Sequence, residues 1–389
     1  MTRLGDVLVD VKPGFATGDN LDDGVFQFRM HNFTREGALD LTKRRRVGAT
    51  ARQLELQSVA PGDVLFNATN SPELVGKSAL IGRLDEPAVF SNHFMRLRTD
   101  LAQLDPGYLA HFLRFQFHRG VFRAMAKAWV NQATIGRDRL EGLEIPLPLV
   151  DEQRRIAAIL DQADAIRAKR SKALSHLDAL PQAMLSSLLN EAHPTLPLGQ
   201  VANFIRGVTF KPADKKEAGE GTVAVMRTKN VQRHLDRSDE IHIAETLVRR
   251  REQYLQPGDT LISSANSWNL VGKACLVPDA LAPAVIGGFV TALRSSGLID
   301  PFYLFNWFVS PKIQALARSF SSQTTSIANL NLKRCEGLDV PVPPKSRQLE
   351  FARQFAAVTA QRDLAVAELA TQDDFFMSLQ VRAFAGAFG

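Results

Sequence analysis

The sequence contains the same arrangement of residues twice, with a period of about 195 residues. Residues 61–81 (PGDVLFNATNSPELVGKSALI) align without gaps with residues 257–277 (PGDTLISSANSWNLVGKACLV), and 11 of the 21 positions are identical. The segment EGLEIPLP at residues 141–148 returns as EGLDVPVP at residues 336–343. A long internal repeat predicts two globular domains of the same fold. A chain of 389 residues is long enough to bury a separate core in each.

Composition and charge narrow the class of protein. Hydrophobic residues make up 45% of the chain and charged residues 23%, which is typical of a globular protein. The formal charge of +6 suits a polyanionic partner, although many proteins with this charge have none. The two cysteines, Cys275 and Cys335, lack the spacing of a zinc site or a disulfide framework. No run of about 18 apolar residues occurs. We therefore expect a cytoplasmic protein without a metal site or a membrane-spanning segment.

Each half of the sequence reads mostly as short strands separated by turns. Pro-Gly-Asp marks a turn, and the short alternating runs that follow are interrupted by Gly-Lys. Residues 106–128 then have a proline near their start and apolar residues at helical spacing, which predicts a helix. A proline-rich segment, IPLPLV in the first half and VPVPP in the second, ends each globular part. Small mixed sheets with helices are the expected content of each domain.

Two long helices are predicted after the proline-rich segments. Residues 151–190 contain no glycine and are rich in good helix formers. Steps of four and three residues connect a stripe of positions, and the positions 195 residues later form a second stripe in the same register. The two stripes are Ile156, Leu160, Ala163, Arg167, Arg170, Leu174 and Leu177, and Phe351, Phe355, Val358, Arg362, Ala365, Leu369 and Gln372. Such stripes predict an intramolecular antiparallel coiled coil. Packing of each helix on its own domain is the alternative.

The predicted fold class is therefore α+β, with two similar globular domains separated by two long helices that form an antiparallel coiled coil. We place the first domain at residues 1–148 and the second at residues 193–343. A central spacer helix occupies residues 149–192, and a C-terminal spacer helix occupies residues 344–389. Pro181 is expected to kink or end the first helix.

The repeated string LVGK resembles the end of a phosphate-binding loop. That loop needs a glycine five residues before the second one, and this position is Ser71. In the second copy Ala274 stands where the magnesium-binding hydroxyl would be. We therefore interpret Lys77 and Lys273 as parts of a shared scaffold turn with an ammonium free for phosphate. A phosphate- or nucleotide-dependent DNA-acting enzyme that uses these Gly-Lys turns remains the alternative function.

Other catalytic patterns are missing from the sequence. It has no GxGxxG after a strand, no Asn/Asp-Pro-Pro-Tyr/Phe loop, no HExxH and no GxSxG. The eight histidines are scattered, and no pair has ligand spacing beside a carboxylate. We predict no catalytic residue, no metal ligand and no cofactor in this chain. A structural coiled-coil adaptor without DNA affinity is a further alternative.

The layout resembles the specificity subunit of Type I restriction-modification enzymes. The resemblance is carried by two similar domains, each closed by IPLPLVDEQRRIAAILDQ or VPVPPKSRQLEFARQF, and by the ending SLQVRAFAGAFG. The second copy departs from the motif, because Ser346 and Arg347 replace Asp151 and Glu152 and only the glutamine is kept. The resemblance implies a non-catalytic subunit whose target recognition domains each bind half of a split double-stranded DNA site. It implies that the paired helices set the gap and dock methyltransferase subunits, two in number, and that restriction subunits can join. S-adenosylmethionine and ATP would then bind to those partners.

Candidate DNA contacts follow from residue chemistry, because Lys and Arg contact phosphates while Arg, Asn, Gln, Ser and Thr read base edges. They lie in the two arginine runs, in the polar stretches after Pro-Gly-Asp, in the Gly-Lys turns and in the segments before the closing strands. A solvated basic loop and an asparagine that satisfies turn backbone are the alternatives for the first two groups. The candidates are Lys43, Arg44, Arg45, Arg46, Asn67, Asn70, Ser71, Lys77, Gln132, Arg137, Arg249, Arg250, Arg251, Ser263, Asn266, Ser267, Lys273, Gln323 and Thr324.

Overall fold

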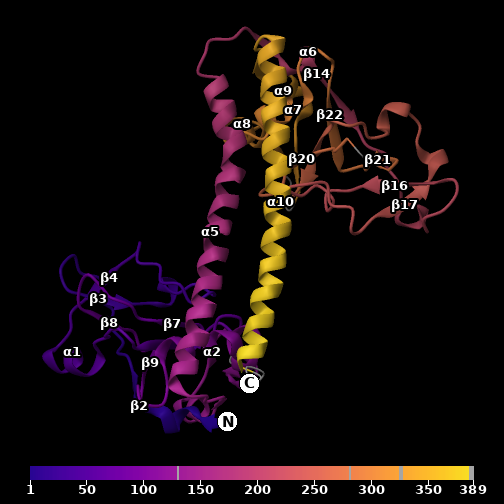
Figure 1. Ribbon diagram of the computed structural model, residues 1–389. Helices are drawn as coiled ribbons and strands as arrows, with labels where there is room; N and C mark the ends of the chain where they lie inside the picture. The colour runs from indigo at the N-terminus through magenta and orange to yellow at the C-terminus, as the bar shows by residue number, and fades with distance from the viewer. Residues whose placement is uncertain (129–130, 280–281, 324–326, 385–389) are drawn as a thin grey trace. The chain divides into compact units, whose positions relative to one another are not determined.

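The chain divides into two compact units in the computed structural model, which describes residues 1–128, 131–279, 282–323 and 327–384 (Figure 1). Unit 1 comprises residues 1–171 and 367–389, and unit 2 comprises residues 172–366. Each unit therefore contains one globular domain together with part of both long helices. The helices are α5 (Val150–Leu188) and α10 (Lys345–Phe384). They lie inside the ranges predicted for the spacer helices, and the four predicted domain boundaries stay a prediction.

Unit 1 is built on four small sheets. The largest has the strand order β2-β9-β5-β7, with antiparallel neighbours. A second sheet has the order β4-β3-β8 and includes one parallel pair, and a third has the order β10-β11-β6. The strands are β1 (Thr2–Arg3), which pairs with β12 (Glu144–Ile145), then β2 (Leu8–Pro13), β3 (Val25–Phe28), β4 (Arg45–Val47), β5 (Val64–Asn67), β6 (Thr69–Asn70), β7 (Ser78–Leu80), β8 (Ala88–Phe90), β9 (Phe94–Thr99), β10 (Lys127–Ala128) and β11 (Ala133–Thr134).

Unit 2 repeats this topology, with β15 as one additional edge strand. The sheet β14-β22-β18-β20 matches β2-β9-β5-β7, the sheet β15-β17-β16-β21 matches β4-β3-β8, and the sheet β19-β24-β23 matches β6-β11-β10. The strands are β13 (Thr195–Pro197), which pairs with β25 (Asp339–Pro341), then β14 (Ala202–Arg206), β15 (Lys215–Lys216), β16 (Thr222–Met226), β17 (Ile241–Ala244), β18 (Thr260–Ser263), β19 (Ala265–Asn266), β20 (Ala274–Leu276), β21 (Ala284–Ile286), β22 (Val290–Ser295), β23 (Ser322–Gln323) and β24 (Ala328–Asn329). The predicted duplication of small mixed sheets is confirmed.

Short helices connect the strands. Unit 1 has η1 (Leu4–Val7), η2 (Met30–Asn32), α1 (Ala51–Gln57), α2 (Pro106–His118), α3 (Val121–Met125) and α4 (Arg137–Glu141). Unit 2 has α6 (Leu198–Val201), η3 (Pro212–Asp214), η4 (Glu245–Leu247), η5 (Arg251–Gln253), α7 (Pro301–Phe308), α8 (Pro311–Ser319) and α9 (Leu332–Glu336). The single helix predicted over residues 106–128 is wrong in extent. Gly120 has a positive φ of 75° and separates α2 from α3.

The repeated Pro-Gly-Asp motif fixes the start of the central strand in each unit. The backbone at Gly62 has a φ of 94°, which favours glycine. The buried Asp63 carboxylate accepts two hydrogen bonds from the Arg98 guanidinium, at 2.7 and 2.9 Å. Asp259 and Arg294 make the same pair in unit 2, with both distances 2.7 Å. The motif recurs because each domain needs the same turn and the same paired carboxylate.

The glutamine kept at the start of each long helix attaches that helix to its domain. The Gln153 side chain is buried, donates to the Pro148 carbonyl at 2.8 Å and accepts from the Asp105 N–H at 2.9 Å. Gln348 is also buried and makes the matching bonds to Pro343 and Asp300, at 2.8 and 2.7 Å. The two positions before each glutamine are solvent-exposed or half-exposed. Their sequences could therefore diverge while the glutamine stayed.

The two long helices run antiparallel within each unit. In unit 1, Arg167 Nε donates to the Asp373 carboxylate at 2.7 Å. In unit 2, Arg362 Nε donates to the Asp178 carboxylate at 2.8 Å, and these two residues are the repeat equivalents of Arg167 and Asp373. The predicted antiparallel helix pair is confirmed.

The helices also pack on the domains, as the alternative proposed. In unit 1 Ile156 and Leu160 belong to the same buried cluster as Phe384. In unit 2 Phe351 is buried with Tyr303. Residues between these contacts, such as Leu364 at 59% exposure, are open to solvent. The helices therefore pair with each other and pack on the domains at once.

Candidate nucleic-acid interface

In unit 1 a small three-stranded sheet brings together two of the sequence-predicted groups. Strand β6, from the polar stretch after Pro-Gly-Asp, pairs with β11, which follows the exposed Gln132. The Thr69 and Thr134 hydroxyls lie 3.2 Å apart across this pair. Asn70 is opposite Ala133 in the register. The fold thus places Thr69 and Asn70 on one sheet with Thr134, and Ser71 and Gln132 directly adjoin its strands. These are residue types that can hydrogen-bond to base edges.

Unit 2 has the same sheet with different side chains. Asn266 of β19 is opposite Ala328 of β24, and Asn329 of β24 is opposite Ser322 of β23. Gln323 is in β23, opposite Ala328. Thr324 lies outside the described residues. Because position 329 corresponds to Thr134, the two sheets present different polar groups in one shared framework.

Two candidates on the central strands are corrected by their burial. Asn67 and Ser263 are both 0% exposed. The Asn67 amide donates to the His93 carbonyl at 3.1 Å, and Ser263 Oγ accepts from the Asn266 amide at 3.0 Å. The side chains of Asn67 and Ser263 are therefore hydrogen-bonded inside their domains, and neither is exposed for contact with a base edge.

Asn70 and Asn266 hold the turns that follow them. The Asn70 amide donates to Asn67 Oδ1 at 2.5 Å, and its own Oδ1 accepts from the Ser71 N–H at 2.8 Å. Asn266 accepts from the Ser267 N–H, also at 2.8 Å. The turn-satisfying alternative for these asparagines is confirmed. Ser71 is half-buried, whereas its equivalent Ser267 is exposed. Ser267 is therefore more accessible to DNA than Ser71.

The two repeated lysines have different surroundings. Lys77 is only 6% exposed, and its Nζ donates to the Phe33 carbonyl at 2.6 Å and to the Met30 carbonyl at 3.1 Å. Burial lowers the pKa of Lys77. The expectation of a free ammonium is therefore wrong for Lys77, and a nucleotide site there is excluded by the same contacts. Lys273 is half-buried and donates to the Gln232 side chain at 2.5 Å. Gly76, with a φ of 92°, makes the turn as expected.

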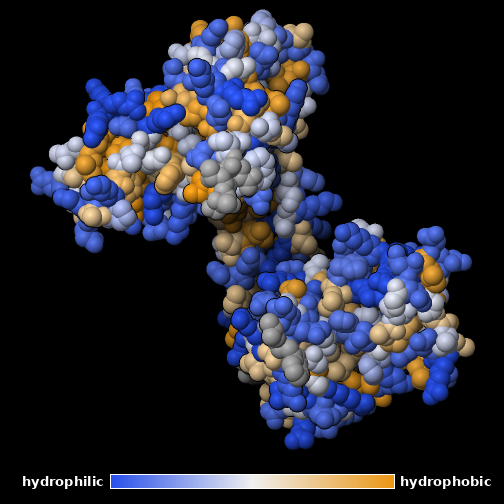
Figure 2. Space-filling view, turned by 180° about the vertical axis from the view of Figure 1, so that it is seen from behind, coloured by the Kyte–Doolittle hydropathy of each residue, from blue (hydrophilic) through white to orange (hydrophobic). Residues whose placement is uncertain are grey.

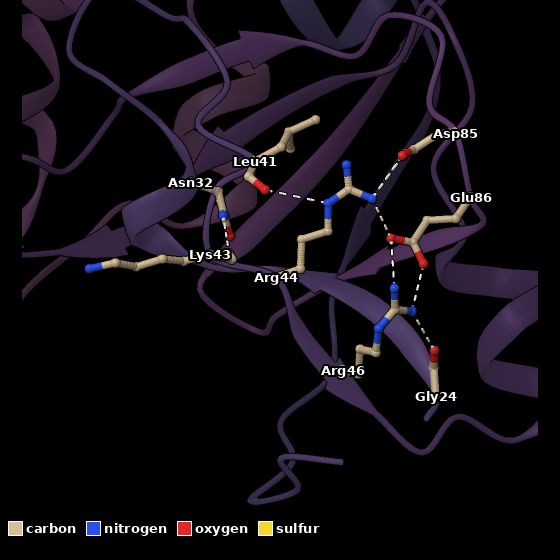
Figure 3. Close-up of polar contacts among 8 residues, drawn as sticks. All are labelled: Gly24, Asn32, Leu41, Lys43, Arg44, Arg46, Asp85 and Glu86. Carbon is tan, nitrogen blue, oxygen red and sulfur yellow. Dashed lines mark hydrogen bonds and ion pairs between the residues drawn. The ribbon is translucent and has the colours of Figure 1, made fainter. Parts of the chain in front are cut away.

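The arginine run of unit 1 forms an ion-pair cluster, which Figure 3 shows. Arg44 Nη1 lies 3.0 Å from the Asp85 carboxylate and 2.6 Å from Glu86, and Arg46 Nη1 lies 2.6 Å from Glu86. Hydrogen bonds from Arg46 and Arg44 lower the pKa of Glu86, so it stays ionised at neutral pH. The exposed Lys43 side chain extends away from these pairs (Figure 3). The two carboxylates of the cluster balance the charges of Arg44 and Arg46, and the neighbouring Lys43 and Arg45 supply the remaining positive charge of this run.

Arg45 has a different partner set. Its guanidinium donates to the Asp19 and Gly18 carbonyls, both at 2.7 Å, and ties the preceding loop to β4. Arg137 on α4 donates to Glu141 at 2.7 Å, and its side chain is 57% exposed. Arg137 is therefore accessible to a phosphate.

The arginines at residues 249–251 are not the structural counterparts of residues 44–46. Strand β4 corresponds to β17, because each pairs with the equivalent neighbour, β3 or β16. Residues 249–251 follow η4 and lead into η5, at the place of α1. The two arginine runs therefore lie on different elements of the two domains. All three arginines are exposed, and Arg250 pairs with Glu252 at 2.7 Å.

Sequence reasoning missed two exposed aromatic side chains beside β19. Trp268 is 42% exposed, and Phe289 is 67% exposed in the turn before β22. The Phe289 carbonyl accepts from the Ser264 N–H at 3.0 Å. The repeat equivalents of these aromatics are Pro72 and His93, so the divergence between the copies was the available signal. Elsewhere the visible face of each unit is mostly hydrophilic (Figure 2).

Across the parts of the chain that the structure describes, no group of three His, Cys, Asp or Glu residues has the arrangement of a metal site. Within the same residues, none of the helices has both the length and the hydropathy to span a membrane.

Comparison with known proteins agrees with this architecture. A family profile described as the Type I restriction modification DNA specificity domain matches residues 53–176. The MjaX type I restriction enzyme specificity subunit of Methanocaldococcus jannaschii is 24% identical, over 92% of this chain and 85% of its own length. The StySPI specificity subunit of Salmonella potsdam is 28% identical over 46% of this chain and 39% of its own length.

Two solved structures share the fold. A chain from a study of complex assembly and conformational transition of the type I R-M system has a TM-score of 0.57 and 19% identity, covering 98% of this chain and 96% of that one. The S subunit from M. genitalium has a TM-score of 0.57 and 17% identity, covering 98% and 95%. Together with the duplicated domains and the paired helices, these findings show that the chain is similar in sequence and in fold to Type I restriction-modification specificity subunits.

Proposed function

We propose that the chain recognises a two-part sequence in double-stranded DNA, with one part read by the domain of each unit. The observation that carries the proposal is the pair of equivalent sheets, β10-β11-β6 and β19-β24-β23, which have one framework but different polar side chains. Equivalent frameworks suit the same task, and different side chains suit different bases. Among the accessible candidates, Gln132 directly precedes β11 and Ser267 directly follows β19, whereas Arg137 begins α4 and Lys273 directly precedes β20.

The proposal includes partners that act on the DNA. Two methyltransferase subunits dock on the long helices and bring S-adenosylmethionine, and a restriction subunit that uses ATP joins them. The support is the similarity to Type I specificity subunits together with the exposed faces of α5 and α10, where Ile166, Leu364 and Phe375 are 44%, 59% and 60% exposed. In this proposal the chain recognises the DNA sequence but does not react with it. Methylation and cleavage are therefore carried out by the partner subunits.

The proposal is tested by reconstituting the chain with its methyltransferase and mapping methylated adenines in random-sequence DNA. We expect methylation at one site with two specified parts separated by a fixed gap. Replacement of Gln132 by Ala should relax the sequence requirement in one part only. Methyl transfer by the chain alone, or methylation without a sequence requirement, would contradict the proposal.

A further inference from the structure

Unit 2 contains a cavity of about 640 Å³ between α7, β20 and the two long helices. Its volume is in the range of sites that hold a ligand or a large side chain. Aromatic and aliphatic side chains from α7 and α10 make its apolar wall. They are Phe302, Phe305, Val309, Phe355 and Val358. Arg233, Arg362 and Asp178 bring charge to the same space.

The equivalent place in unit 1 is almost filled. The cavity that remains there has a volume of about 90 Å³ and is lined by Gly107, Ala110 and Arg114 on α2. Phe376 of α10, 6% exposed, packs beside α2 and α5 in this unit. The Arg167 guanidinium carbon lies 4.5 Å from the centre of the Phe376 ring, and that of Arg114 lies 5.5 Å from it. An aromatic ring between two guanidinium groups completes this side of unit 1.

At three positions unit 2 lacks the ring or the charged group of its equivalent. The repeat of 195 residues places Pro181 at the position of Phe376, Val309 at that of Arg114 and Thr359 at that of Asp164. In unit 1 Arg114 and Asp164 form an ion pair. All three replacing residues line the cavity of unit 2. The cavity is therefore the space that the aromatic ring and the ion pair occupy in the other copy.

One of the two guanidinium groups that flank the ring in unit 1 is kept in unit 2. Arg362, the equivalent of Arg167, donates to Asp178 at 2.8 Å and has a side chain 15% exposed. Arg233 also pairs with Asp178. Phe302 and Phe305 replace Gly107 and Ala110 and add aromatic surface to the wall. The cavity thus keeps one of the two guanidinium groups that flank the ring in unit 1, and Phe302 and Phe305 add aromatic surface, whereas the ring itself is absent.

We propose that this cavity receives an aromatic side chain of a partner polypeptide that docks on the long helices. The proposal rests on the proposed function for the existence of that partner. A side chain on a polypeptide is favoured because the occupant in unit 1 is a phenylalanine carried by a helix. The apolar wall excludes a charged group from the centre, and the guanidinium groups at its side favour the face of a ring. The partner's aromatic side chain would then occupy in unit 2 the place that Phe376 of the chain itself occupies in unit 1.

The test fills the cavity from within the chain. Pro181→Phe restores the ring at its unit 1 position, and Pro181→Ala is the matched control that removes the proline without filling the space. In the full-length chain we expect Pro181→Phe to melt several degrees above Pro181→Ala. Indole, used as a soluble aromatic probe, should bind the wild type and Pro181→Ala, and its affinity for Pro181→Phe should fall at least tenfold.

Assembly with the methyltransferase tests the partner. We expect Pro181→Phe to weaken assembly at least tenfold and Pro181→Ala to leave it unchanged. Val309→Phe, which fills the same space from the end of α7 while α5 stays intact, should act like Pro181→Phe, with Val309→Ala as its control. Normal assembly of both phenylalanine variants would overturn the proposal, and indole binding in that case would assign the cavity to a small aromatic ligand. If the wild type assembles with no methyltransferase, the proposed function fails, whereas the indole and melting comparisons still report on the cavity.

Discussion

At the scale of single residues, burial decides which repeated side chains can meet DNA. Lys77 and Lys273 are identical in sequence context, yet one ammonium binds two buried carbonyls and the other a side-chain amide at the surface. The sequence could not predict this difference. The carbonyls come from Met30 and Phe33, which lie outside the aligned repeat. Asn67 was misassigned for the same reason, because its partner is the distant His93 carbonyl.

Replacing Lys77 by Ala should destabilise unit 1. Its loss leaves two carbonyls without their donor, and an unsatisfied buried group typically costs about 1–3 kcal/mol. Lys273→Ala is the matched control and should change the free energy of unfolding by less than about 1 kcal/mol. Urea unfolding measures both. Equal effects of the two replacements, or loss of a measurable ATP affinity on replacing Lys77, would contradict the structural role.

Replacing Glu86 by Gln should strengthen binding to duplex DNA. The pKa of Glu86 is lowered by its arginine partners, so at neutral pH its carboxylate opposes the charge of Arg44 and Arg46. Removing that charge frees the arginines for phosphate, and the slope of log affinity against log salt should steepen by roughly 1. Asp151→Asn removes one exposed acidic charge outside the cluster and serves as the control. An unchanged slope for Glu86→Gln would place the cluster away from DNA.

At the scale of elements, the repeat predicts much of the fold because local motifs fix the same contacts twice. The aspartate of Pro-Gly-Asp, the tyrosine of each α2-type helix and the glutamine of each long helix are buried and hydrogen-bonded in both units. Tyr108 and Tyr303 each donate to a carbonyl of the proline-rich segment, at 3.0 and 2.9 Å. The arginine runs do not follow this rule, because the partners of Arg44 and Arg46 are Asp85 and Glu86, whereas Arg250 pairs with Glu252. Residues 44–46 and 249–251 consequently fall on different elements.

Replacing Gln348 by Ala should loosen the start of α10. The change leaves the Asp300 N–H and the Pro343 carbonyl without their side-chain partner, and we expect a cost of about 1–3 kcal/mol in the free energy of unfolding. Ser346→Ala, at an exposed position two residues earlier, should be nearly neutral. Hydrogen exchange of the first turns of α10 reports the local effect. Protection equal to the wild type in Gln348→Ala would show that the glutamine does not hold the helix.

At the scale of the whole molecule, α5 and α10 each belong to both units, since the boundaries fall at residues 171–172 and 366–367. The two units share the same backbone framework but differ in their side chains, both in the small three-stranded sheets and around the cavity of unit 2. The proposed function depends on the number of helical residues between the two domains, since each residue adds about 1.5 Å and 100° of rotation to a helix.

Four residues inserted after Lys172, together with four inserted after Ala367, should change the gap of the recognised DNA site. Each insertion adds roughly 6 Å of helix, and inserting in both helices preserves their pairing on either side. Insertion in α5 alone is the control and should lower the free energy of unfolding by shifting one helix against the other. Mapping of methylated adenines measures the gap. Unchanged recognition of the original gap by the double insertion would argue against a spacer role.

The two interhelical ion pairs, Arg167 with Asp373 and Arg362 with Asp178, have an evolutionary consequence. The helix α5 alone carries one arginine and one aspartate at the positions that α10 also uses. An ancestral chain of half this length would therefore have been self-complementary, and two copies of it could have formed both pairs as a homodimer. Fusion of the two genes would then have freed each domain to acquire its own preference, whereas a homodimer must read the same bases twice.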